Sequence, residues 1–315
     1  MFDFALPMRT TLSVINKLFY KLRQLGLALV ILPLASTASA KPALLDHYHR
    51  LLNGDNNTLP GTHISLASSQ QDDVLSAEVN SILHTPFETV AATMVQASNW
   101  CQVMPLHFNI KACTYETREG KEVLTVYSGR KIYENPDDSY PISYQFEIVR
   151  HDDAQLSLRL RAAAGPVSTR DYLIELDAMP VAEGTLLHIH SSYRSSWLSS
   201  MLTSTYLATA GSDKVGFSRI EQDGEMVPVQ GIKGIIERNV MRYHLAINAF
   251  LGTLSLPEAD RLEATLASWF EQNDNYPPLH EMDETEYLQI KRREWHNQQQ
   301  LQQALNDRLQ LAIVP

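Results

Sequence analysis

The stretch from Gly231 to Gly252 constrains the fold most, because its apolar residues recur with the period of an α-helix. On a helix they share one face: Ile232, Ile235, Ile236, Val240, Tyr243, Ile247 and Phe250. Asn239 falls in the middle of that face and Arg242 on its edge, and the residues expected to point away are Glu237, Met241 and Asn248. Either this is a core helix in which Asn239 has a hydrogen-bond partner, or it lies across a sheet as one wall of a ligand cavity.

The net charge of −10 on 315 residues argues against nucleic acid as a partner, because binding phosphates needs a basic surface. It argues equally against stable docking on anionic lipid head groups. With 44% hydrophobic and 20% charged residues, the chain has an ordinary globular composition.

The first forty residues have the order of a secretory signal. Lys17, Lys21 and Arg23 precede an apolar run over 25–34, and Ala38-Ser39-Ala40 follows. We expect residues 1–40 to be a signal peptide cleaved near Ala40, which makes the protein periplasmic or secreted. An uncleaved anchor is the alternative, but the run of about ten residues is shorter than the roughly 20 that span a bilayer. Translation from Met1 or from Met8 is left open.

Export determines how the two cysteines are interpreted. Cys101 and Cys113 are expected to form a disulfide in an oxidising compartment, with two buried free thiols as the alternative. Without clustered histidines beside them, they do not make a zinc site.

Apolar and polar residues alternate in several segments, which indicates antiparallel strands with one buried face. The expected strands are 64–67, 74–83, an extended segment from 108 to 113, 123–133, 142–148, 156–160, 172–177, 186–193, 214–220 and 227–229. No glycine-rich phosphate loop occurs and strands do not alternate with helices, so a nucleotide-binding α/β fold is not expected.

Helices are expected on both sides of this strand-rich part. Residues 44–52, 257–272 and 282–311 are predicted helices, and 197–207 is either a short amphipathic helix or a mobile cover. A further helix over 85–98 begins with Thr85 as its cap and Pro86 at its first position.

The order of these features resembles the START-like family, also called the helix-grip or polyketide-cyclase-like superfamily. The resemblance rests on Thr85-Pro86-Phe87, the bend from Asn99-Trp100 to Met104-Pro105, the run of antiparallel strands and the long helix after them. Arg170-Asp171-Tyr172 is similar to the Arg-Asp-aromatic entry of START domains, although Arg170 and Asp171 are expected to be a structural pair rather than a site.

The resemblance implies an α+β fold in which a curved antiparallel β-sheet grips a long α-helix on its carboxyl-terminal side. The domain would cover 62–252, after an approach segment at 41–61 and before a helical extension at 253–315. An apolar cavity would lie between the helix and the inward residues of the strands, which are Tyr144, Phe146, Leu158, Leu160, Tyr172, Ile174 and Ile189. The expected ligand-binding residues are Asn239, Arg242, Tyr243, Ile232, Ile236, Tyr144, Phe146, Tyr172, His188 and His190.

No catalytic group, metal site or cofactor is expected. His188 and His190 lie on the same side of a strand and could begin a metal site, but nothing in the sequence marks a third ligand. No Gly-x-Ser-x-Gly motif occurs.

Three functions are compatible with these features. The first is an exported binding or carrier protein for a lipid or other apolar small molecule, with transient membrane contact allowed. The second is an enzyme of the cyclase or hydrolase type acting on an apolar substrate in the same cavity. The third is an envelope interaction module that uses the Gln-rich helix at 282–311 to bind an unidentified protein partner or itself.

Overall fold

The computed structural model describes residues 40–54, 57–196 and 215–313. Residues from Ala40 to Pro315 form one compact unit. Its helices are α2 (Ala40–Asn53), α3 (Phe87–Met94), α4 (Ala97–Val103), α6 (Gly231–Gly252), α7 (Glu258–Asp274) and α8 (Glu284–Ile313). Its strands are β1 (Ile64–Gln71), β2 (Val74–Leu83), β3 (Ile110–Arg118), β4 (Lys121–Ser128), β5 (Tyr140–Asp152), β6 (Gln155–Ala164), β7 (Arg170–Val181), β8 (Gly184–Arg194), β9 (Arg219–Gln222) and β10 (Glu225–Pro228).

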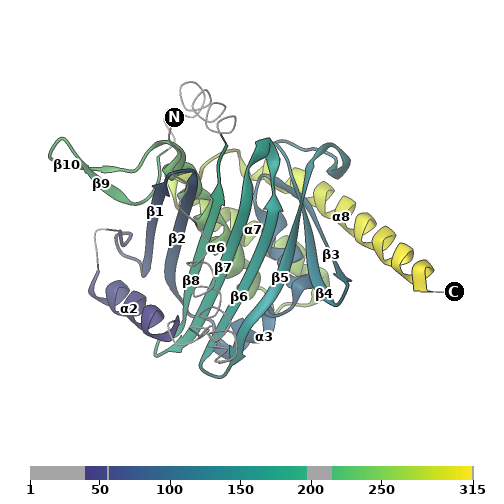
Figure 1. Ribbon diagram of the computed structural model, residues 1–315, viewed down its shortest axis with the longest axis horizontal. Coiled ribbons are helices and arrows are strands. Elements are labelled where there is room, and N and C mark those ends of the chain that lie inside the picture. Colours follow the sequence, from purple (N-terminus) through teal and green to yellow (C-terminus); the bar gives the residue numbers. More distant parts are fainter. Residues whose placement is uncertain (1–39, 55–56, 197–214, 314–315) are drawn as a thin grey trace, which may run out of the picture. The chain divides into compact units, whose positions relative to one another are not determined.

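The first eight strands form one sheet in the order β1-β2-β8-β7-β6-β5-β4-β3, and each described pairing is antiparallel. Side chains therefore alternate between its two faces. In β5, for example, Ile142, Tyr144 and Phe146 are buried, whereas their neighbours are exposed. Figure 1 shows the helix α6 behind this sheet.

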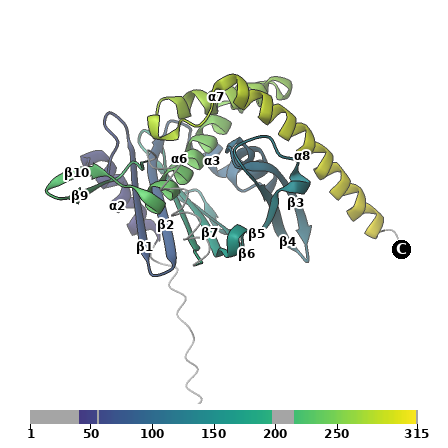
Figure 2. The same cartoon turned by 90° about the horizontal axis from the view of Figure 1, so that it is seen from above.

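The helix α6 packs against β1, β2 and β8 on the concave side of the sheet, and α7 covers its back. Figure 2 shows α6 between the sheet and α7, with α8 running from α7 along the side of β3. A single large apolar core joins the inner face of the sheet to these helices. The predicted fold class, a curved antiparallel sheet gripping a long helix, is confirmed. Among the described helices, none is both long and apolar enough to cross a bilayer.

The sequence predicts the bounds of α6 correctly but not its surroundings. Glu237 and Met241, expected to point away, are fully buried. Glu237 accepts hydrogen bonds from Ser68 Oγ at 2.6 Å and from Phe217 N at 2.7 Å. A Cβ on Gly234 would stand 3.0 Å from the backbone nitrogen of the residue at 216, so this glycine permits the close approach. The helix is covered on every side because later segments pack on its back.

The helix expected over 85–98 is wrong in two respects. It is broken between α3 and α4, where Gln96 adopts an extended conformation. Thr85 makes no cap, since Pro86 stands at the cap position without a side-chain hydrogen bond. The backbone carbonyl of Thr85 instead accepts a hydrogen bond from Thr185 Oγ1 at 2.7 Å.

Smaller differences concern element ends. The strand expected over 123–133 ends at Ser128, and the last two short strands form a separate hairpin of β9 and β10. The expectation for residues 197–207 lies outside the described residues.

Arg170 and Asp171 belong to a larger group of charges at the end of the sheet. Asp73 accepts hydrogen bonds from Arg170 at 2.8 Å and from Arg194 at 2.6 Å. Arg194 also lies 3.2 Å from Asp171, whereas Arg170 and Asp171 are 3.8 Å apart. The group joins the turn before β2 to the start of β7 and the end of β8.

Cys101 in α4 and Cys113 in β3 form the predicted disulfide, with their Cα atoms 4.9 Å apart. Both residues are buried. The bond ties the helix that precedes the Met104-Pro105 bend to the edge strand of the sheet.

The Gln-rich helix α8 covers the edge of β3 that has no neighbouring strand in the described part of the chain. Gln298 Oε1 accepts a hydrogen bond from Cys113 N at 2.7 Å, and Gln298 Nε2 donates to Cys101 O at 2.8 Å. Gln302 Oε1 likewise accepts a hydrogen bond from Tyr115 N, and Gln302 Nε2 donates to Tyr115 O, each at 2.9 Å. Unpaired strand edges invite pairing with other chains. Two glutamines of α8 therefore have a structural role at this edge.

A group of three buried charges also holds α8 against the sheet, nearer the amino-terminal end of the helix than the two glutamines. Glu294 lies between two ammonium groups, 2.8 Å from Lys111 Nζ and 2.7 Å from Lys291 Nζ. The lysines also donate to backbone carbonyls, Lys111 to Phe108 O and Lys291 to His107 O. Burial lowers the pKa of Lys291 to about 8, while the Glu294 carboxylate acts in the opposite direction. These contacts hold the segment at 104–110 in place.

We expect Gln298→Leu to lower the free energy of unfolding by roughly 2 kcal/mol, because it leaves a buried amide of the β3 edge without an acceptor. Denaturant unfolding followed by circular dichroism measures this change. The matched control is Gln300→Leu, two residues further along the same helix at an exposed position, for which we expect a change within about 0.5 kcal/mol. Equal effects of the two substitutions would contradict the structural role of Gln298.

Candidate ligand-binding site

A cavity of about 220 Å³ lies between α6 and the strands at the β3 side of the sheet. Apolar and aromatic side chains dominate its wall, and a few polar groups face it. The lining residues are Met104, His107, Asn109, Ile110, Val126, Ser128, Ile142, Tyr144, Pro166, Tyr172, Tyr193, Asn239 and Tyr243.

Three tyrosines of the sheet form its aromatic wall. Tyr172 on β7 stacks on Tyr193 on β8 with ring centroids 5.2 Å apart, and it meets Tyr144 on β5 edge to face at 6.4 Å. Gly165 makes room for this arrangement, since a Cβ there would stand 2.4 Å from the Tyr172 ring. Thr169 Oγ1 lies 2.7 Å from the Tyr172 hydroxyl and holds that end of the ring.

The turn that carries Pro166 into the cavity wall is strained. Val167 and Ser168 both have positive φ angles, 56° and 57°. A β-branched residue rarely adopts this conformation, and such strain costs roughly 1–3 kcal/mol per residue. The turn between β6 and β7 is therefore held in its conformation by its surroundings, next to the cavity.

The polar part of the cavity is an imidazole–amide pair. His107 Nδ1 accepts a hydrogen bond from Asn109 N at 3.1 Å, so Nε2 carries the proton and donates to Asn239 Oδ1 at 3.3 Å. The His107 ring also stacks on Tyr243, with centroids 5.2 Å apart. Asn239 and Tyr243 are one turn apart on α6 and point the same way.

The titratable groups of the cavity are neutral at neutral pH. Burial, reinforced by the nearby Arg242 and Lys291 cations, lowers the pKa of His107 well below its usual range. Burial raises the pKa of Tyr193 to about 12 and that of Tyr144 well above its usual value. No carboxylate occurs among the lining residues. This set of groups suits binding through apolar area and a few hydrogen bonds better than proton transfer.

Four of the expected ligand-binding residues line the cavity together, namely Asn239, Tyr243, Tyr144 and Tyr172. Arg242 does not: its guanidinium is buried and donates to Glu281 at 2.8 Å and to Leu279 O at 3.2 Å. These partners belong to the segment after α7, and no pattern in the sequence predicts that this segment packs against α6. Ile232, Ile236 and Phe146 also lie away from the cavity, in other parts of the apolar core.

His188 and His190 lie on the opposite face of the sheet. Leu187 and Ile189 are buried in the main core, and alternation then turns the two histidines outward. His188 stacks instead on His47 of α2, with ring centroids 4.7 Å apart. Burial lowers the pKa of His188 to about 3. The expectation that these histidines face the ligand is wrong.

His107 is one of the cavity residues that the sequence does not reveal, and it is the one that pairs with Asn239. It follows the Met104-Pro105 bend in a segment without periodicity, and its position depends on Lys291, which is far along the chain. The only sequence signal was the bend itself.

A second hollow, of about 330 Å³, lies between α4, α7 and α8. Charged residues line much of it, including Glu258, Arg261, Lys291 and Glu294. Glu294 and Lys291 are already satisfied by one another and by backbone carbonyls. These two groups are therefore already engaged within the protein.

The sequence matches no protein-family model and no curated protein. Solved structures with a similar arrangement include Ara h 8.0201, at 8% identity over 63% of this chain and 99% of that chain, with a TM-score of 0.34. The Zhui aromatase/cyclase from Streptomyces sp. R1128 is 11% identical over 67% of this chain and 96% of that chain, with a TM-score of 0.28. The di-domain ARO/CYC StfQ from the steffimycin biosynthetic pathway is 12% identical over 64% of this chain and 52% of that chain, with a TM-score of 0.32. These values are too low to assign a family, a ligand or a reaction to this chain.

We expect the stability of the protein to fall as the pH drops below about 6.5, in part because of His107. Its pKa is lowered in the folded state, so below 6.5 the unfolded chain binds a proton that the folded chain does not, and unfolding is favoured. His107→Gln should reduce the slope of unfolding free energy against pH by up to about 1.4 kcal/mol per pH unit. Denaturant titrations between pH 5 and 7.5 measure the slope.

The control for this measurement is His63→Gln, a histidine with an exposed side chain. Its slope should equal that of the unmodified protein. A His107→Gln slope that also equals it would show that His107 takes up protons equally in both states, contrary to its burial.

Proposed function

We propose that this chain is an exported binding protein for a small apolar molecule held between α6 and the sheet. The cavity of about 220 Å³ carries the proposal, because it combines a tyrosine-rich wall with one imidazole–amide pair. Apolar area supplies the affinity, roughly 25 cal/mol per Å² buried before ordering costs, and the polar pair sets orientation.

The volume narrows the ligand class. Typical pockets for drug-sized ligands have roughly 300–1,000 Å³, whereas an apolar cavity of about 150 Å³ binds benzene. A cavity of about 220 Å³ accordingly suits one or two fused rings. A membrane lipid with two acyl chains would need more room than this. A hydroxyl or carbonyl group on the ligand would face Asn239 and His107.

An enzyme acting in the same cavity is the second candidate, favoured by the presence of His107 in the wall. A general base works best with a pKa near the operating pH. Because the pKa of His107 is held well below that range, binding without chemistry is the better-supported function.

The interaction function assigned to α8 is the third candidate. Gln298 and Gln302 bond to the strand edge and are not available to a partner. The exposed end of α8, which includes Leu311 at 76% exposure, is where we would place an unidentified protein partner.

Export is part of the proposal. The signal-like order of residues 17–40 supports it, and so does the disulfide, since such bonds persist in oxidising compartments. The compact unit begins at Ala40, beside the expected cleavage position.

We expect the protein recovered from the periplasm of a Gram-negative expression host to begin near Lys41 and to contain no free thiol. Intact mass spectrometry with and without a thiol-alkylating reagent measures both properties. A full-length amino terminus in the membrane fraction would support the uncleaved anchor instead.

We expect the purified protein to bind 1-naphthol with one-to-one stoichiometry, measured by fluorescence or calorimetric titration. Val126→Phe, which fills the cavity, should weaken this binding at least tenfold, because the added ring occupies the space of the ligand. The matched control is Val149→Phe on β5, where the side chain is 44% exposed and does not line the cavity. Undetectable binding of 1-naphthol and of other one- and two-ring phenols and ketones would overturn the proposed function.

A further inference from the structure

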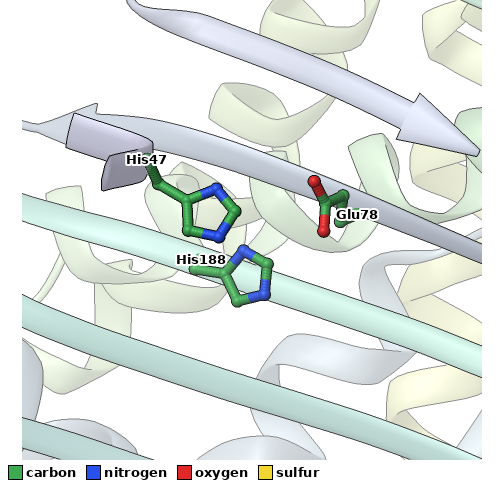
Figure 3. A group of neighbouring side chains, drawn as sticks. All are labelled: His47, Glu78 and His188. Carbon is green, nitrogen blue, oxygen red and sulfur yellow. The ribbon is translucent and has the colours of Figure 1, made fainter. Parts of the chain in front are cut away.

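The outer face of the sheet carries a group of side chains that the cavity does not use. His47 of α2, Glu78 of β2 and His188 of β8 each offer one ligand atom, and these atoms lie within 4.8 Å of one another. All three residues are half-buried. Figure 3 shows a nitrogen of each imidazole turned toward the other ring, with the Glu78 carboxylate beside them.

Helix packing and strand register bring the three residues together. Leu44 and Leu51 of α2 pack against Met179 and Leu186 in a small second core, which fixes the helix on the sheet. Glu78 pairs with His190 across β2 and β8, so it stands diagonally beside His188. His47 is then held over His188, with ring planes inclined by 27°.

We propose that His47, Glu78 and His188 bind a zinc ion, with a fourth position open to water. Two imidazoles and a carboxylate are a ligand set that Zn²⁺ takes in proteins, and three protein ligands leave one coordination position open. Zinc–ligand bonds of roughly 2.0–2.2 Å require ligand atoms closer together than the present upper limit of 4.8 Å. The three side chains are half-buried, so rotation about their side-chain bonds can bring the ligand atoms closer together.

A neighbouring amide orients one of the ligands. Asn80 Oδ1 lies 2.8 Å from His188 Nδ1 and accepts a hydrogen bond from it. This hydrogen bond places the proton on Nδ1 and leaves the lone pair of the neutral ring on Nε2. Metal-binding histidines commonly donate their second ring nitrogen to an oxygen in this way. Asn80 is buried at 4% exposure, so the arrangement is shielded from water.

The charges around the group are compatible with a cation. Asp46, Glu78 and Asp177 all act on His47 electrostatically, and Arg50 is the opposing positive charge. Arg50 Nη2 donates to His47 Nδ1 at 2.8 Å and also pairs with Asp46. A metal ion bound to His47 would displace the hydrogen bond from Arg50 to His47. The Arg50 guanidinium would remain paired with the Asp46 carboxylate.

The bound ion would join α2 to the sheet. His47 lies on α2, whereas Glu78 and His188 lie on two adjacent strands, so the ion adds a link across the second core. Since this site is on the face opposite the cavity, its occupancy is independent of the proposed function. Zinc binding should therefore raise the melting temperature without changing the affinity for 1-naphthol.

Calorimetric titration of tag-free, chelator-treated protein with Zn²⁺ tests the proposal. We expect saturable binding of one ion per chain and, with Co²⁺ in place of Zn²⁺, the visible absorption of a four-coordinate site. The absence of saturable Zn²⁺ binding to the unmodified protein would overturn the proposal, whatever the behaviour of any variant.

Variants locate the site. His47→Ala, His188→Ala and Glu78→Gln should each weaken Zn²⁺ binding by at least tenfold, and Asn80→Ala by about tenfold through loss of orientation. His49→Ala is the matched control, because His49 is an exposed histidine on the same helix outside the group. Glu78→Gln keeps size and shape, and circular dichroism verifies its fold. Wild-type affinity in folded Glu78→Gln, or equal loss in His49→Ala, would contradict the assignment.

Discussion

The buried carboxylate of Glu294 between two lysine ammonium groups is the contact on which the site depends. Lys111 comes from the edge strand β3, and Lys291 and Glu294 come from α8, so the group joins the sheet to the last helix. Removing one partner of such a group typically costs roughly 3–5 kcal/mol, because a charge is left uncompensated. Both lysines also hold carbonyls of the segment that presents His107 to the cavity. The binding site is therefore built partly by residues beyond the gripped helix.

The helices that follow α6 in the chain also explain why α6 is buried on all sides. In a helix-grip fold without further helices, the back of the gripped helix would face solvent, and its polar residues would be expected there. Here α7 covers that side, the Trp269 indole donates to the carbonyl of Arg242 at 3.1 Å, and Arg242 pairs with Glu281. The residues at 253–313 thus complete the core and fix the helix that carries Asn239 and Tyr243.

The sequence predicts local features well and distant contacts poorly. The ends of α6 and the strand-rich middle follow from periodicity, and Asn239 was identified because it interrupts an apolar face. The inward placement of Ile189 was also predictable, and it is incompatible with His188 and His190 facing the ligand, since neighbours in a strand point to opposite faces. His107, Glu281 and Glu294 could not be predicted, because their partners lie far away in the chain. The proximity of His47 and Glu78 to His188 cannot be predicted for the same reason.

The proposed function depends on a ring-sized ligand binding between α6 and the sheet. A crystal structure of the protein soaked with 1-naphthol tests it most directly. We expect the naphthol rings to lie against Tyr144 and Tyr172, with the hydroxyl group within hydrogen-bonding distance of Asn239 or His107. Naphthol found only in the groove between α7 and α8, with the space under α6 filled by water or collapsed, would contradict it.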